Sequence, residues 1–85
     1  MAGMWPDRVE IDAAGDVALT AEAAAVVLGI PLDAFLADLR AGVVYSVVER
    51  GEGEDAGRLR LTLRRRATER VLVVEAATGR VIEAA

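Results

Sequence analysis

Apolar and polar residues alternate at the start of the chain, in residues 9–12 and again in residues 17–19. Residues 13–16, between the two stretches, have the small and polar composition of a turn. Alternation with a period of two is typical of a strand with one buried side. The sequence therefore predicts a short N-terminal β segment, either a hairpin or a bent strand.

The apolar pattern becomes helical after Thr20. Thr20 is a good N-cap and Gly29 suits the position after a helix, which predicts a first helix over residues 21–28. Pro31 suits the first position of a second helix, which ends before Gly42. We expect the apolar side of this second helix to pack on the sheet. That side consists of Leu32, Phe35, Leu36 and Leu39.

The second half of the chain has the composition of antiparallel strands joined by short turns. The predicted fold class is α+β: a single domain, residues 1–85, in which a helical hairpin packs on an antiparallel β-meander behind the short N-terminal β segment. The predicted strands are residues 43–50, 58–66, 70–76 and 81–82, with a Gly-rich and acidic loop at residues 51–57.

A symmetric loop would place Arg50 opposite Arg58. That register pairs polar with polar and apolar with apolar side chains, which is how register is usually specified. The expected partners are Ser46 with Thr62, Tyr45 with Leu63, and Val47 with Leu61.

Composition excludes several classes of chemistry. The 85 residues include no Cys, His or Lys, so a disulfide, a Cys/His zinc site, a histidine base and a Schiff-base lysine are all excluded. No pair of carboxylates can be placed for acid–base work, and we expect neither an enzyme nor a bound cofactor. A chain this short has a marginal core, and association with a second copy is the remaining way to stabilise it.

No apolar run is long enough to span a membrane, and residues 1–9 lack the basic and apolar regions of a signal peptide. The absence of Cys fits a reducing compartment. We therefore expect a cytoplasmic protein that does not bind a membrane.

Charge is distributed unevenly. Residues before Arg58 include three Arg and eleven acids, and the rest of the chain includes seven Arg and three acids. An arginine-rich sheet side could bind RNA or an acidic protein. RNA-binding sheets usually carry aromatic side chains, which this stripe lacks, so we favour an acidic protein partner or pairing with carboxylates such as Glu49, Glu69 and Glu75. The candidate interaction residues are Arg50, Glu54, Asp55, Arg58, Arg60, Arg64 and Arg66.

The acidic loop has two interpretations. Its carboxylates could hold Ca²⁺ or Mg²⁺, but their spacing is not that of an EF-hand loop. Alternatively, Arg50 or Arg58 pairs with Glu54 or Asp55 and keeps the loop in one conformation. We favour a structural turn over a metal site.

The sequence of the two predicted helices resembles that of a helix-turn-helix followed by a wing. The alternative function is therefore a nucleic-acid-associated regulator of the winged-helix type. However, the outward side of the second helix would carry Asp33 and Asp38, and DNA binding depends on cationic contacts with phosphates. Nucleic acid is therefore an unfavoured partner.

The order of Arg40-Ala41-Gly42, Ser46 and residues 49–62 resembles a family of short bacterial proteins that is catalogued only as a domain of unknown function. The resemblance covers most of the chain and departs at residues 63–66, where an aromatic, His-containing stretch is expected. It implies a bacterial, cytoplasmic accessory protein and no particular activity.

Several predicted strands carry apolar residues on both sides, although a helical layer covers only one side of a small sheet. The side left bare needs another cover. Met4 and Trp5 could supply part of it, and a second copy of the chain could supply more, so we expect a homodimeric interaction module. The bare set is either Val44, Val48 and Leu72, or Val43, Val47, Val71 and Val73.

Overall fold

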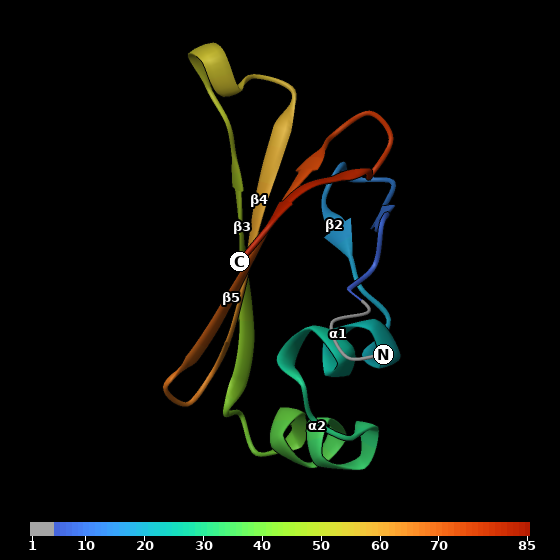
Figure 1. Ribbon diagram of the computed structural model, residues 1–85, viewed down its shortest axis with the longest axis vertical. Helices are drawn as coiled ribbons and strands as arrows, with labels where there is room; N and C mark the ends of the chain where they lie inside the picture. Colours follow the sequence, from blue (N-terminus) through green and yellow to red (C-terminus); the bar gives the residue numbers. More distant parts are fainter. Residues whose placement is uncertain (1–4) are drawn as a thin grey trace.

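The computed structural model describes residues 5–85. It contains two helices packed on one side of a four-stranded antiparallel sheet, with a small hairpin beside them (Figure 1). The α+β prediction is therefore confirmed. In chain order the elements are β1 (Glu10–Ile11), β2 (Val17–Ala18), α1 (Ala21–Leu28), α2 (Leu32–Arg40), β3 (Val44–Arg50), the 3-10 turn η1 (Gly53–Asp55), β4 (Arg58–Arg65), β5 (Thr68–Glu75) and β6 (Val81–Ala84).

Helix α1 has the ends that the sequence predicts. The Thr20 hydroxyl accepts a hydrogen bond from the Ala23 amide at 3.0 Å. Gly29 follows the helix with φ +72°, a left-handed conformation that glycine adopts without a steric cost. Helix α2 ends at Arg40, as predicted, and none of the described helices is long and apolar enough to cross a membrane.

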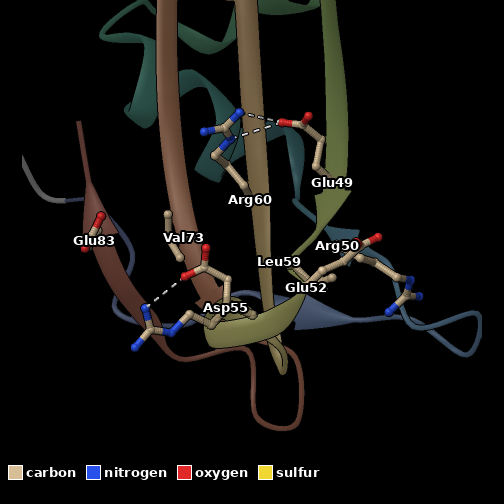
Figure 2. Close-up of a pocket in the computed structure, with 10 residues that line it drawn as sticks. Glu49, Arg50, Glu52, Asp55, Leu59, Arg60, Val73 and Glu83 are labelled. Atoms are coloured by element: carbon tan, nitrogen blue, oxygen red, sulfur yellow. Dashed lines mark hydrogen bonds and ion pairs between the residues drawn. The ribbon is translucent and has the colours of Figure 1, made fainter.

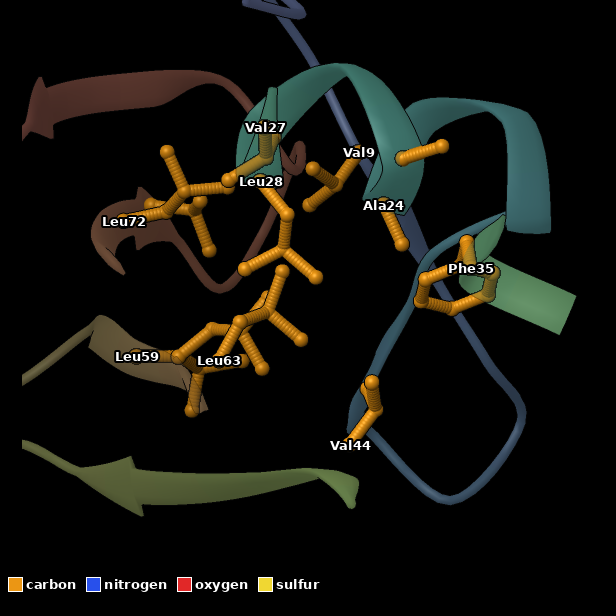
Figure 3. Close-up of a cluster of buried hydrophobic side chains, with 12 residues drawn as sticks. Val9, Ala24, Val27, Leu28, Phe35, Val44, Leu59, Leu63 and Leu72 are labelled. Atoms are coloured by element: carbon orange, nitrogen blue, oxygen red, sulfur yellow. The ribbon is translucent and has the colours of Figure 1, made fainter. Parts of the chain in front are cut away.

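The core lies between α1 and the inner side of the sheet, which is the side that faces the helices (Figure 3). The predicted apolar side of α2 is only partly correct. Phe35 is buried, whereas Leu32 and Leu39 are exposed, because α2 packs beside α1 at the end of the sheet and contacts the sheet mainly at β3. The buried residues are Val9, Ala24, Ala25, Val27, Leu28, Phe35, Val44, Leu59, Leu61, Leu63, Leu72 and Val74.

The predicted register of β3 and β4 is wrong by one residue. Arg50 lies opposite Leu59, Ser46 opposite Leu63, Val47 opposite Thr62, and Tyr45 opposite Arg64. The loop is not symmetric, because the amide of Gly51 already bonds to the carbonyl of Arg58 at 3.0 Å and η1 takes up the residues between them. A shift of one residue changes which side chains of the two strands share a side of the sheet.

The observed register decides which apolar set the helices cover. Val44 and Leu72 are buried on the inner side of the sheet, whereas Val47, Val71 and Val73 lie on the opposite side, which we call the outer side. Val43 does not belong to the bare set, because it precedes β3 and packs against the core.

The N-terminal segment closes the far edge of the sheet. The Val9 amide donates to the Gly79 carbonyl, and the Val81 amide donates to the Asp7 carbonyl, both at 2.8 Å. Trp5 packs against the core on the helical side, so it does not cover the outer side, and Met4 lies outside the described residues. The last strand is longer than predicted and runs to Ala84.

Phe35 is the large side chain by which α2 joins the core, and it is 5% exposed. Replacing it with alanine leaves a cavity, so we expect Phe35→Ala to lower the free energy of unfolding by about 3–5 kcal/mol. Leu32→Ala, on the exposed side of the same helix, is the matched control and should cost much less. Urea unfolding followed by circular dichroism measures both, and equal midpoints would exclude Phe35 from the core.

Candidate interaction site

The candidate residues that the structure brings together surround a hollow of about 450 Å³ at the loop end of the outer side (Figure 2). Arg58 and Arg60 come from β4, Asp55 from η1, and Glu49 from β3. Val73 and Glu83 close the hollow on the side of β5 and β6. Neighbouring strands position these side chains, because residues directly opposite in a ladder point to the same side of the sheet.

The arginines on the outer side pair with carboxylates. Arg60 contacts one oxygen of Glu49 through Nε at 3.0 Å and through Nη2 at 2.9 Å, and these two residues are cross-strand partners. Arg58 lies 3.7 Å from Asp55, which agrees with one of the pairs expected in the loop. At the far end of the same strand, Arg64 lies 3.4 Å from Glu69. Exposed pairs of this kind contribute about 0–1 kcal/mol each, so they neutralise charge more than they stabilise the fold.

Arg50 lies at the rim of the hollow, but its side chain points away from Asp55 and Arg60 (Figure 2). Its guanidinium donates to the Gly15 carbonyl at 3.3 Å and lies 3.8 Å from the Asp16 carboxylate. Of the two arginines considered for the acidic loop, Arg58 is therefore the one that pairs with it, because the observed register turns Arg50 toward the N-terminal hairpin. Arg50 connects that hairpin to the sheet.

Two further candidates lie away from the hollow. Glu54 is exposed on η1 and forms no ion pair with another described residue. Arg66 was predicted on the arginine stripe of the strand, but it lies in the turn after β4 with φ +56° and is 3.9 Å from Asp38 of α2. Because the turn begins at Arg66, its side chain leaves the sheet at the end opposite the hollow.

Asp38 has a role that sequence reasoning missed. Its carboxylate accepts a hydrogen bond from Arg65 Nε at 2.6 Å, and only 15% of its side chain is exposed. This half-buried ion pair attaches α2 to the end of β4. The helix-turn-helix interpretation placed Asp38 on the outward side of the second helix. In the structure, Asp38 instead points toward the end of β4. The only sequence feature that pointed to this ion pair was the arginine run at residues 64–66, and the run did not identify Asp38 as the partner of Arg65.

The acidic loop is held by its backbone as well as by Arg58. A Cβ atom at Gly51 would collide with the Asp55 carbonyl oxygen, so this position requires glycine. The Ala76 amide donates to the Gly57 carbonyl at 2.8 Å and connects the loop to the turn after β5. Within residues 5–85, no three acidic side chains converge in a way that could hold a metal ion.

Glu75 is a carboxylate whose surroundings perturb its pKa. It accepts hydrogen bonds from Arg80, at 3.1 and 3.0 Å, and from the Thr78 hydroxyl at 3.0 Å. The Arg80 guanidinium first, and the Thr78 hydroxyl second, lower the pKa of Glu75 below its ordinary value. In return, Glu75 raises the pKa of Arg80. The ion pair joins the two ends of the turn between β5 and β6, so its role is structural.

A different surface, formed by β3 and the neighbouring α2, also carries exposed apolar side chains. Tyr45 is 54% exposed and Val47 46% exposed, both on β3, and Leu39 of α2 is 49% exposed. Tyr45 and Leu39 also line an apolar groove of about 250 Å³ between the helices and the sheet, together with Ser46 and Phe35. The strand pattern placed Val47 in one of the two possible bare sets, whereas the exposure of Tyr45 and Leu39 was not predictable, because it depends on the register of β3 and on the position of α2.

The two surfaces differ in what they can bind. The hollow contains Arg50, Arg58 and Arg60 against four carboxylates, so it has no excess of positive charge for phosphates or for an acidic protein. The surface along β3 can bury apolar area against another polypeptide.

One comparison with known proteins gave a match. The model of a family described as "Family of unknown function (DUF6522)" matches residues 6–85. The expected resemblance to a family of unknown function is therefore confirmed. Neither the curated proteins nor the solved structures include a match to this chain.

The loop contacts predict an ordered loop at residues 51–57. Backbone order parameters measured by NMR relaxation should exceed about 0.6 throughout it. Gly51→Ala should lower them because of the collision with Asp55. Arg58→Ala should change them little, since its ion pair is exposed. Lower values throughout the parent loop would contradict this description.

The Glu75 environment predicts a pH dependence of stability. Because the folded pKa of Glu75 lies below its ordinary value of 4.5, its contribution to stability is present above that value and is lost as the pH falls through the lowered folded pKa. Glu75→Gln should therefore melt below the parent at pH 7, and the two should converge in acid. Glu52→Gln, in the exposed loop, is the control. A difference in melting temperature that grows in acid would contradict the assignment.

Proposed function

We propose that this chain, which belongs to the DUF6522 family of unknown function, is a non-catalytic interaction module that works as a homodimer. The surface that supports this proposal is the apolar one along β3. Homodimers commonly use a patch that matches itself, since a twofold axis places the same residues on both sides of the interface.

The observation that carries the proposal is where the exposed apolar residues lie. Five large hydrophobic residues are exposed among residues 5–85. Tyr45 and Val47 lie on β3, and Leu39 lies on the neighbouring α2. The other two, Val26 and Leu32, lie on the helices. Apolar side chains that cluster on the surface of a soluble protein usually mark an interaction site, whereas scattered ones are normal, and Tyr45 and Val47 lie on the same side of β3.

The size of the core favours the same conclusion. A domain of 85 residues buries a smaller share of its surface than a larger one, so a second copy adds apolar burial that the chain itself cannot supply.

The non-catalytic part of the proposal rests on the side chains available. The four carboxylates in the hollow are exposed, and two of them, Glu49 and Asp55, pair with arginine, which is unlike the buried and perturbed groups of most catalytic sites.

Light scattering at micromolar concentration should give a mass of about twice the 9.0 kDa of one chain. Val47→Arg should give a folded monomer, because the side chain is exposed in a single copy and the charge would be buried in the dimer. Val48→Arg is the neighbouring control. Its side chain packs against the core, so this variant should lose the native circular dichroism spectrum.

A parent chain that stays at 9.0 kDa up to millimolar concentration would end the homodimer proposal. A dimeric Val47→Arg variant would remove β3 from the interface and leave self-association to another surface.

A further inference from the structure

The two edges of the four-stranded sheet are protected differently. The edge at β6 is short, contains a bulge near Val73 and Val74, and is covered in part by the N-terminal segment through its bonds to Gly79 and Val81. The edge at β3 is seven residues long and pairs with β4 in a regular register. In the part of the chain that the structure describes, β3 pairs with no strand but β4. Natural edge strands are usually shortened, bulged, charged or covered, because a free edge accepts another strand.

The main-chain groups at this free edge can be identified. Gly51 bonds to Arg58 in the same register as the strands. Hydrogen-bonded and non-hydrogen-bonded pairs alternate along an antiparallel ladder, so Val47 and every second residue from it bond to β4. The residues between them direct their amide and carbonyl groups to the free edge. These are Val44, Ser46, Val48 and Arg50.

We propose that the free edge of β3 is the dimer interface, where β3 pairs antiparallel with β3 of a second copy to join the two sheets into one. This inference rests on the proposed homodimer and names its contact. Full overlap of two strands that run from Val44 to Arg50 places the twofold axis at Val47. Val47 then faces Val47 of the second copy in a non-hydrogen-bonded pair, and Ser46 and Val48 of opposite copies exchange main-chain hydrogen bonds.

The side chains suit that register. Val47, 46% exposed in one copy, packs against its equivalent, because side chains are closest in a non-hydrogen-bonded pair. Tyr45, 54% exposed, lies diagonal to Val47 of the second copy, within reach of an aromatic ring. Glu49 lies opposite Tyr45, and Arg50 lies opposite Val44, so no two like charges meet across the ladder. The edge is therefore self-complementary in shape and in charge.

The absence of Cys makes a single-cysteine scan the direct test. In the proposed pair, the two Cα atoms at position 47 lie about 4.5 Å apart, within the range that a disulfide bridges. We expect Val47→Cys to form a covalent dimer under mild oxidation, seen on a non-reducing gel. Tyr45→Cys lies on the same strand and is at least as exposed, but its two copies would be about 14 Å apart along the strands, so it should not cross-link efficiently.

Val26→Cys controls for random collision, because Val26 is 45% exposed on α1, away from the edge.

A second test removes the edge amide itself. Ser46→Pro deletes an N–H group that no described residue uses and should give a folded monomer, whereas Ser46→Ala keeps that amide and should remain a dimer.

The outcomes separate the two proposals. A monomeric parent by light scattering removes both the homodimer and its interface. A dimeric parent in which Val47→Cys cross-links no faster than Val26→Cys overturns the edge pairing and leaves the homodimer standing. If Ser46→Pro also stays a dimer, it overturns the edge pairing independently of the cysteines.

Discussion

The rest of the structure depends on the burial of a long sheet under one short helix. Helix α1 has eight residues and is about 12 Å long, whereas the eight residues of β4 extend about 27 Å. The helix therefore covers only part of the inner side, on which Leu59, Leu72 and Val74 are almost fully buried. It cannot cover the loop end, which projects beyond the helices, or the edge at β3 (Figure 1). Both candidate surfaces lie away from this helix: the hollow at the loop end of the outer side, and the exposed side chains of β3.

The sequence predicted what local signals determine. The Thr20 cap, the glycine after α1 and the alternation in β4 each act within a few residues, and the elements they predict are present. Register was not predictable in the same way, because it depends on how the loop folds. The turn η1 and the Gly51 contact with Arg58 shift the pairing by one residue. That shift brings Val48 toward the core and leaves Val47 exposed, so the exposure of Val47 could not be predicted from the strand pattern alone.

The arginine candidates show a similar limit. Their alternation placed Arg58, Arg60 and Arg64 on one side of a strand, as the structure does. The partners of Arg50 and Arg65 are 34 and 27 residues away along the chain, at Asp16 and Asp38. Sequence spacing contains no information about contacts of that kind. These two pairs connect the N-terminal hairpin and α2 to the sheet, so part of the charge that suggested a binding site instead holds the fold together.

The charge pattern of the outer side is consistent with a joined sheet. A twofold axis through a ladder of two β3 strands is perpendicular to the sheet, so both helical layers lie on one side and both outer sides lie on the other. The outer side of each copy carries the Arg60–Glu49 and Arg64–Glu69 pairs on either side of Val47. Charged pairs keep this open side compatible with water, while in the proposed dimer the exposed Val47 and Tyr45 at the edge would meet a second copy. The apolar residues further in, Val71 and Val73, are already half-buried and need no partner. The distribution of exposed apolar area therefore favours association through the edge over stacking of the two outer sides.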